Sequence, residues 1–285
     1  MSPRVLAPLA LALALASGGC NWIRDPGGNA EAQDAPEQAP VPDTVEGFLA
    51  ELAPLPNGAK GIQIDYEVSG PALSGELHTT LGPGGQRRDR WQLRSTAGDE
   101  FLTIAGTSVV STTQLWIGSD GEPGELRPNA LVELGKAYLA RDAEERAKII
   151  ASIRSWHETL AAQRERNSGE LDTVAGTSCL RTRIAAQNVC MWEQANVMLA
   201  YEGAAFSIKA SKIDDQIELK ADSFELPPLA VRAEKVEATG AQDFEGILDE
   251  LAAGSHAKVA VLLYANLGMP AMQMPEAKAE PPSAN

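Results

Sequence analysis

Alternating apolar and polar residues predict a first group of strands. In the stretch GIQIDYEVSG, Ile62, Ile64, Tyr66 and Val68 alternate with polar residues over eight positions. A period of two sustained over this length predicts a strand with one buried face. The pattern continues in LSGELHTTL, RWQLR, EFLTI and SVVSTTQLWIG, and GPGGQ is typical of a hairpin turn. We therefore expect an antiparallel meander of about five strands with one solvated face.

Helical spacing of apolar residues replaces this alternation in three places. The segment TVEGFLAELA, with Thr44 as a candidate N-cap, predicts a short helix before the strands. Residues 130–166 carry no strand pattern, and a capping box from Asp142 to Glu145 predicts two helices with a break near Arg141. The segment AQDFEGILDELAAGSHAKVAVLLYANLG predicts further helix near the C-terminus.

A second group of strands is expected after about Thr173. The segments CMWEQ, VMLAYEG, AFSIKASKI and QIELKADSFELP, the last covering residues 216–227, again alternate. The predicted order is helix, strands, two helices, strands, helix. Sheet faces that are apolar on one side need a cover, and the helices provide one. The predicted fold class is α+β, with an antiparallel sheet covered by helices and a helical insertion at 130–166.

The N-terminus has the pattern of an export signal. Arg4 precedes an apolar run of 12 residues, Val5 to Ala16, which is too short to span a membrane. Small residues and then Cys20 follow, so the segment resembles a bacterial lipoprotein signal in which the cysteine is acylated and becomes the first mature residue. That pattern prefers Leu where this chain has Ser17. The alternative is ordinary cleavage after Ala16.

These patterns divide the chain into four parts. Residues 1–19 are predicted to be the signal peptide. Residues 20–43 are rich in Pro, Ala and acidic residues, which is typical of a disordered tether. Residues 44–267 form the predicted α+β domain, and residues 268–285 form a second disordered tail.

Composition narrows the classes of partner. Of the 285 residues 44% are hydrophobic, enough for a sizeable core, and only 5% are aromatic. The formal net charge of −15 disfavours nucleic acids as partners, because their phosphates would be repelled. The same negative charge would be repelled by anionic lipid headgroups, so the expected membrane contact is the acyl group on Cys20.

The cysteine count supports that anchor. The chain has three cysteines, and an odd number in an exported protein needs an explanation. If Cys20 carries lipid, Cys179 and Cys190 remain and are expected to pair in an oxidising compartment. A symmetric hairpin would place poor turn residues at its centre, whereas a turn at AAQN would place Arg183 opposite Cys190. The disulfide is therefore expected to be offset or to close a longer loop.

No motif indicates catalysis, a metal or a cofactor. The three histidines lie far apart in the sequence, and HExxH, CxxC and GxSxG motifs are absent. The glycines of GPGGQ lack a P-loop lysine. The cysteine pair has neither CxxC spacing nor an adjacent helix start, which disfavours redox activity. We predict a protein that is not an enzyme and carries no cofactor or metal, and an enzyme remains a minor alternative.

Part of the sequence resembles a known superfamily. The motifs are YEVSGPALSGELHTT followed by GQRRDRWQL, then AGTSCLRTRIAAQNVCMWE, ASKID and FELP, between Gly61 and Pro227. They are similar to motifs of LolA/LolB/LppX-type envelope lipoproteins. The resemblance implies a curved half-barrel sheet, closed by helices over an apolar cavity that holds lipids or lipoproteins. The insertion at 130–166 and the helix after Phe244 have no counterpart in that pattern.

The resulting hypothesis is a lipoprotein of the bacterial outer membrane, facing the periplasm, that binds a lipid or acyl chain in its half-barrel. Asn21 after the acylated cysteine favours the outer membrane by resemblance to enteric sorting. The alternative is a tethered structural or protein-interaction module with a filled core. The candidate cavity residues are Ile62, Ile64, Tyr66, Trp91, Leu93, Leu115, Ile117, Phe206, Ile208, Ile217 and Leu219.

Overall fold

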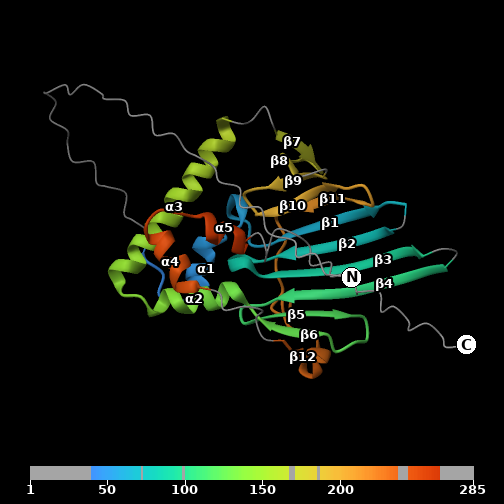
Figure 1. Cartoon of the computed structure of the whole chain (residues 1–285), viewed down its shortest axis with the longest axis horizontal. Helices are drawn as coiled ribbons and strands as arrows, with labels where there is room; N and C mark the ends of the chain where they lie inside the picture. The colour runs from blue at the N-terminus through green and yellow to red at the C-terminus, as the bar shows by residue number, and fades with distance from the viewer. Residues whose placement is uncertain are drawn as a thin grey trace, which may run out of the picture. The chain divides into compact units, whose positions relative to one another are not determined.

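The computed structural model describes residues 40–71, 73–97, 100–166, 171–184, 187–236 and 243–263. This part of the chain is an α+β fold in which helices are grouped at one end of a curved sheet (Figure 1). The predicted signal peptide, Cys20, most of the tether and the C-terminal tail lie outside the described residues, and for them the sequence predictions stand untested.

The described strands form one 12-stranded, open and mostly antiparallel sheet. Its order is β12-β6-β5-β4-β3-β2-β1-β11-β10-β9-β8-β7. Only the pairing of β12 with β6 is parallel. The strands are β1 (Ile62–Ser69), β2 (Leu73–Leu81), β3 (Arg87–Ala97), β4 (Glu100–Val110), β5 (Gln114–Ser119), β6 (Glu125–Pro128), β7 (Leu171–Val174), β8 (Thr177–Ile184), β9 (Gln187–Trp192), β10 (Val197–Glu202), β11 (Ser207–Asp214) and β12 (Glu234–Lys235).

The sheet curves most strongly toward its β7 edge. β7 comes into contact with β11, which lies four places away in the strand order. Register shifts between Asp65 and Tyr66 in β1 and between Met198 and Ala200 in β10 mark irregular pairings. Such bulges bend a strand and increase its twist. The sheet therefore turns over on itself at this edge, and β10 is buried along four successive residues.

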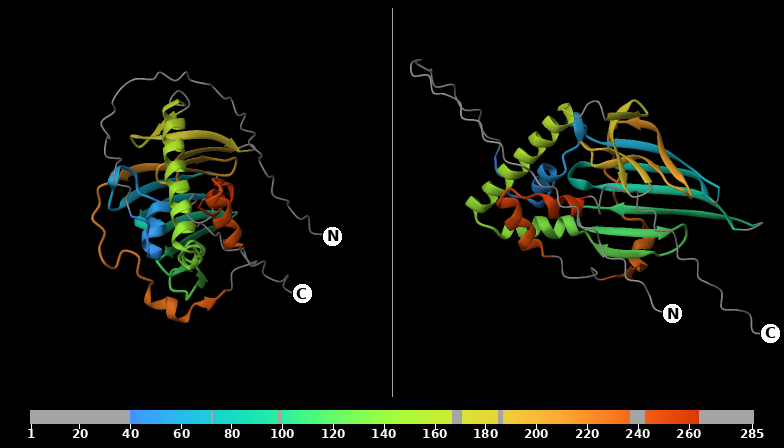
Figure 2. Two further views of the ribbon diagram at one scale, coloured as in Figure 1. Left: turned by 90° about the vertical axis from the view of Figure 1, so that its left-hand side faces the viewer. Right: turned by 45° about the horizontal axis from the view of Figure 1, so that its top comes forward.

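Five helices are described, and α3 runs across the ends of the strands (Figure 2). α2 and α3 occupy the predicted region between the two strand groups. As predicted, α1 is capped by Thr44, and Asp142 begins α3 by accepting a hydrogen bond from the backbone N–H of Glu145. The helices are α1 (Val45–Leu52), α2 (Ala130–Ala140), α3 (Ala143–Arg166), α4 (Phe244–Ala252) and α5 (Ala257–Leu263).

The predicted strand at residues 216–227 is wrong. Residues 221–224 form a turn, and the rest of the segment has no regular secondary structure. β11 ends at Asp214, whose side chain accepts a hydrogen bond from the backbone N–H of Gln216. Ile217 and Leu219 nevertheless pack close to Gly61 at the start of β1. The apolar residues of this segment alternate because they pack against the sheet, although the segment's backbone does not pair with a strand.

Two further boundaries differ from expectation. The predicted strand SVVSTTQLWIG is divided: its first three residues join EFLTI in one strand, β4, and QLWIG belongs to β5. β4 continues through Gly106 beneath the ring of Trp91. The predicted C-terminal helix is divided into α4 and α5 at Gly254, whose φ of +82° lies in the left-handed region that favours glycine.

The buried side chains form separate sheet and helix clusters. The sheet core comes from β1–β3 and β7–β11, and a second core comes from the five helices. A small third cluster lies where Phe224 and Ala230 pack against Val109 and Trp116 of the sheet. One connection between the two larger cores is the turn Pro83–Gly85, which contacts α1. Gly84 of this turn lies close to Leu49.

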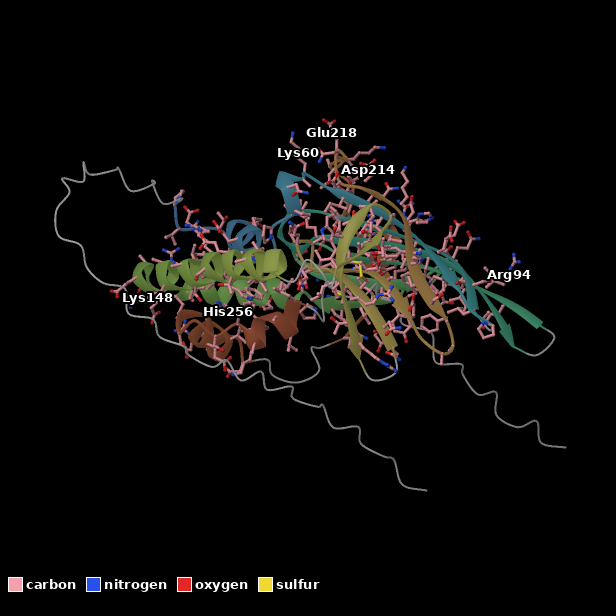
Figure 3. The ribbon with its side chains drawn as sticks, turned by 90° about the horizontal axis from the view of Figure 1, so that it is seen from above. Lys60, Arg94, Lys148, Asp214, Glu218 and His256 are labelled. Carbon is pink, nitrogen blue, oxygen red and sulfur yellow. A yellow bond between two sulfur atoms is a disulfide. The ribbon has the colours of Figure 1, made fainter. Side chains whose placement is uncertain are left out.

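The predicted disulfide between Cys179 and Cys190 is present, and it joins diagonal neighbours of β8 and β9. Arg181 lies directly opposite Cys190, so the bridge is offset by two residues, as expected. The AAQN register is wrong, because Ile184 pairs with Gln187 and Arg183 therefore lies opposite Asn188. Both cysteines are buried in the sheet core, and the disulfide that joins them is drawn in yellow in Figure 3.

Candidate functional site

Most of the predicted cavity residues belong to the sheet core. Six of them are at most 7% exposed: Ile62, Ile64, Tyr66, Trp91, Leu93 and Ile208. Ile117 and Phe206 pack against that core, Leu219 packs against the third cluster, and Leu115 and Ile217 are half-buried. Their role as ligand contacts stays a prediction. None of the eleven lines the cavity between the helices and the sheet that is described below.

A buried polar network lies on the same inner face of the sheet. Arg87 Nε donates to both carboxylate oxygens of Asp89, at 3.0 and 2.8 Å, and both side chains are 1% exposed. Thr79 Oγ1 donates to Asp89 at 2.6 Å, and Ser108 Oγ does so at 3.3 Å. The sequence analysis missed this network. Their spacing could have revealed it, because Arg87 and Asp89 lie four and two residues before the buried Trp91 and so share its face of the strand.

Tyr66 connects this network to the curled part of the sheet. Its hydroxyl donates to the backbone carbonyl of Met198 at 2.8 Å, across 132 residues of sequence. Burial raises the pKa of the Tyr66 hydroxyl above its ordinary value. The phenol therefore stays protonated and acts as a structural donor. Nothing in this arrangement leaves room for a substrate, since Thr79, Asp89 and Tyr66 are all at most 1% exposed.

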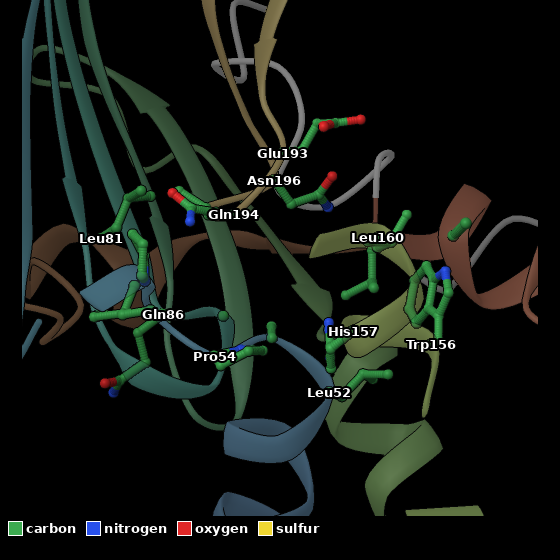
Figure 4. Close-up of a pocket in the computed structure, with 18 residues that line it drawn as sticks. Leu52, Pro54, Leu81, Gln86, Trp156, His157, Leu160, Glu193, Gln194 and Asn196 are labelled. Carbon is green, nitrogen blue, oxygen red and sulfur yellow. The ribbon is translucent and has the colours of Figure 1, made fainter. Parts of the chain in front are cut away.

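The candidate site is a cavity of ≈240 Å³ where the helices meet one end of the sheet (Figure 4). Its walls come from α1, α3 and α5, from the turn between β2 and β3, and from the turn between β9 and β10. The lining is mostly apolar. The lining residues are Leu52, Ala53, Pro54, Leu55, Pro56, Leu81, Gly82, Gly85, Gln86, Trp156, His157, Leu160, Glu193, Gln194, Ala195, Asn196, Ala260 and Leu263.

Local sequence explains why the cavity forms there. α1 ends at Leu52, and Pro54 cannot continue it, so the chain passes through an extended Leu55 into a 3-10 turn at Pro56–Gly58 before β1. On the opposite wall, the β9–β10 connection is a tight turn. Its backbone is held by hydrogen bonds from Ala195 N–H to Trp192 and from Asn196 N–H to Glu193. Because both segments are held in these conformations, neither fills the space between the sheet core and the helix core.

Two polar side chains of the lining already have partners. His157 Nε2 lies 3.1 Å from the backbone carbonyl of Glu51, so this nitrogen carries the proton and donates. Burial lowers the pKa of His157, which keeps the imidazole neutral at neutral pH. Gln194 Oε1 accepts a hydrogen bond from the indole of Trp192 at 3.2 Å. These contacts orient the side chains and supply neither a nucleophile nor a charged acid–base pair.

Asn196 differs from these two residues. Its Nδ2 is buried and has no hydrogen-bond partner within the described structure. In Figure 4 the amide nitrogen lies on the side of the labelled Leu160 and His157. A buried donor without an acceptor is uncommon and costs free energy. The sequence analysis did not single out Asn196, because turn chemistry alone accounts for an asparagine there.

The described residues contain no group of three or more His, Cys, Asp or Glu side chains that could hold a metal ion. Within the same ranges, no helix combines the length and apolar character needed to cross a membrane. The cavity is a largely apolar space whose lining includes one acidic residue, Glu193, and one buried donor without a partner, Asn196 Nδ2.

In comparisons with known proteins, no family model matches this sequence, and no curated protein matches it significantly.

Proposed function

We propose that this chain is a membrane-anchored periplasmic lipoprotein of the outer membrane that binds a hydrophobic ligand and catalyses no reaction. The anchor is the acyl group on Cys20. The ligand is a lipid or acyl chain, and its site is the cavity between the helices and the sheet. The single observation that carries the binding proposal is this largely apolar cavity, with Trp156, Leu160 and Leu263 among its lining residues.

Physical considerations support a ligand of modest size. An enclosed, engineered apolar cavity of about 150 Å³ binds benzene, and this partly open one, at ≈240 Å³, is larger. Burial of apolar ligand surface contributes about 25 cal/mol per Å². The cavity lies below the range of about 300–1,000 Å³ that is typical of drug-sized ligands. It therefore suits one apolar chain better than a whole two-chain lipid.

The finer description of the fold belongs to the same proposal. We infer that the curved sheet corresponds to a half-barrel of the LolA/LolB/LppX type. In that reading α2 and α3 are an insertion that covers one end of it. The quoted sequence motifs and the observed curvature support this relationship.

The alternative is a tethered structural or interaction module without a ligand. One observation favours it: the inner face of β1–β3 is filled by its own side chains, with Ile62, Ile64 and Leu77 fully buried. In that case the cavity between the cores would be a packing defect. The two proposals differ in whether the cavity takes up an apolar molecule.

The binding proposal is tested on the full-length protein purified from membranes. We expect lipid to co-purify in native mass spectrometry, and the delipidated protein to bind the apolar dye N-phenyl-1-naphthylamine with increased dye fluorescence. Ala260→Phe places a bulky ring in the cavity from α5 and is expected to weaken dye binding by about tenfold or more.

Val261→Phe is the matched control, because Val261 is the next residue of α5 and is 69% exposed. It should leave the dye affinity unchanged. Circular dichroism verifies that both variants fold. Absence of co-purified lipid together with absence of dye binding would exclude the carrier proposal and favour the structural module.

The anchor is tested separately. Cys20→Ala removes the only predicted acylation site and is expected to move the protein from the membrane fraction to the soluble periplasmic fraction. The double variant Cys179→Ala/Cys190→Ala should stay in the membrane fraction, because it loses only the disulfide. Mass spectrometry of the N-terminal peptide distinguishes an acylated Cys20 from a mature chain that begins at Ser17. A Cys20→Ala protein that remains membrane-bound would refute the lipid anchor.

A further inference from the structure

The position of Asn196 is fixed by its backbone. It lies in the turn between β9 and β10 with a φ of +49°, a left-handed conformation that asparagine tolerates better than most residues. Its backbone N–H is bonded to the carbonyl of Glu193. The turn therefore presents the Asn196 side chain at the cavity wall in a defined orientation, with Nδ2 buried and without an acceptor.

The neighbouring side chains of Gln194 and His157 do not supply that acceptor. The Oε1 of Gln194 accepts the Trp192 indole, and the Nε2 of His157 donates to the Glu51 carbonyl. Figure 4 shows Glu193 directed away from the labelled His157 and Leu160. Nδ2 itself is covered, while Asn196 as a residue is only half-buried. Rotation of the side-chain amide would bring Nδ2 to the cavity surface, where a ligand oxygen would satisfy a donor that the described protein leaves unsatisfied.

The charge of the lining restricts what kind of acceptor this is. No lysine or arginine lines the cavity, and its one ionisable acid is Glu193. His157 is neutral and commits its proton to the protein backbone. A carboxylate ligand would lose its hydration without gaining a counter-ion from the lining. An uncharged carbonyl oxygen avoids that cost and accepts one hydrogen bond.

We propose that Asn196 determines the specificity of the cavity, selecting single-chain amphiphiles whose head carries an uncharged ester or amide carbonyl over the corresponding carboxylates. This inference rests on the proposed binding function and names the ligand class for the same site. The chain of the ligand lies against Trp156, Leu160 and Leu263, and its carbonyl oxygen accepts a hydrogen bond from Asn196 Nδ2.

The experiment compares two ligands with the same chain. The delipidated protein is loaded with N-phenyl-1-naphthylamine at pH 8, and the dye is displaced with 1-monolauroylglycerol or with laurate, each below its aggregation concentration. We expect laurate to compete about tenfold less well, or worse, since it lacks a counter-ion in the cavity.

Two substitutions remove the Asn196 donor without disturbing the turn. Asn196→Gly keeps the left-handed conformation, and Asn196→Asp keeps the side-chain shape. We expect each to weaken competition by 1-monolauroylglycerol about tenfold, while the affinity for the dye, which has no carbonyl, changes less than about twofold. Gln194→Glu is the control for charge, because it adds the same charge two residues away and keeps the acceptor for Trp192. It should leave competition by 1-monolauroylglycerol nearly unchanged.

The outcomes separate this inference from the proposed function. If the dye binds but laurate and 1-monolauroylglycerol displace it equally well, the role of Asn196 is rejected and the binding function is not. The same holds if 1-monolauroylglycerol displaces the dye from both Asn196 variants as well as from the wild-type protein. Absence of dye binding in the wild-type protein would overturn both. If Gln194→Glu weakens displacement by 1-monolauroylglycerol as much as Asn196→Asp does, the effect comes from the added negative charge. That result would also reject the role of Asn196.

Discussion

Replacing Arg87 with methionine is expected to lower the free energy of unfolding by about 3–5 kcal/mol. Arg87 and Asp89 are each 1% exposed, and the guanidinium Nε binds both carboxylate oxygens. Methionine fills similar space but leaves the carboxylate inside the protein without its cationic partner, while the hydroxyls of Thr79 and Ser108 still donate to it. Two neutral hydrogen bonds do not replace an ion pair for a charge removed from water.

Urea denaturation followed by circular dichroism measures this effect, and two further variants show its cause. The double variant Arg87→Met/Asp89→Leu removes both charges and should recover most of the lost stability. Arg90→Met makes the same substitution at an exposed position of β3 and should change the free energy of unfolding by about 0.5 kcal/mol or less. If Arg87→Met were no more costly than Arg90→Met, the ion pair would not be an essential part of the sheet core.

Phe48→Ala is expected to have a similarly large effect, about 3–5 kcal/mol, but on the helices. Phe48 is fully buried in α1, and its ring stacks on that of Tyr138 in α2 with 4.3 Å between the ring centroids. Truncation leaves a cavity in the helix core that the surrounding backbone cannot close. Because the sheet has a hydrophobic cluster of its own, the damage should be felt first in the helices.

Hydrogen–deuterium exchange distinguishes this local effect from a general loss of stability. In Phe48→Ala, amide protection should fall more in α1–α4 than in β1–β3. Val261→Ala, at a position that is 69% exposed, serves as the control and should change neither region appreciably. Equal loss of protection in helices and sheet would contradict the inference that the two cores are energetically separate.

Several elements could be predicted because their signals are local. Thr44 and Asp142 cap helices as expected, and the alternation from Ile62 to Val68 corresponds to β1. A cap needs only one side chain and the next turn of backbone, while a strand face needs only a repeat of two. The disulfide could be predicted from the number of cysteines. The register of the two strands that it joins depended on the position of the hairpin turn.

The errors have a common origin in long-range contacts. Residues 216–227 alternate like a strand, yet β1 already pairs with β2 on one side and with β11 on the other, so no edge is free beside it. The segment therefore packs its apolar residues against side chains instead. Pairing partners are decided by the whole sheet, and alternation alone does not specify them.

The candidate cavity could not be located from the sequence for the same reason. Residues that line it come from four separate parts of the chain: Leu52, Trp156, Asn196 and Leu263. No periodic pattern joins them. The inner-face residues that alternation singled out form the core, because close packing fills a strongly curved sheet with its own side chains.

The sequence by itself determined the α+β class, most helix and strand positions and the pairing of Cys179 with Cys190, because local spacing and residue chemistry carry that information. It also supplies the prediction of a lipid anchor at Cys20, which awaits its test. Only the tertiary structure decided which apolar faces pack against each other and where a cavity remains between the helices and the sheet. That outcome depends on side-chain volumes meeting across more than 200 residues, from Leu52 to Leu263, and no stretch of the sequence records it alone.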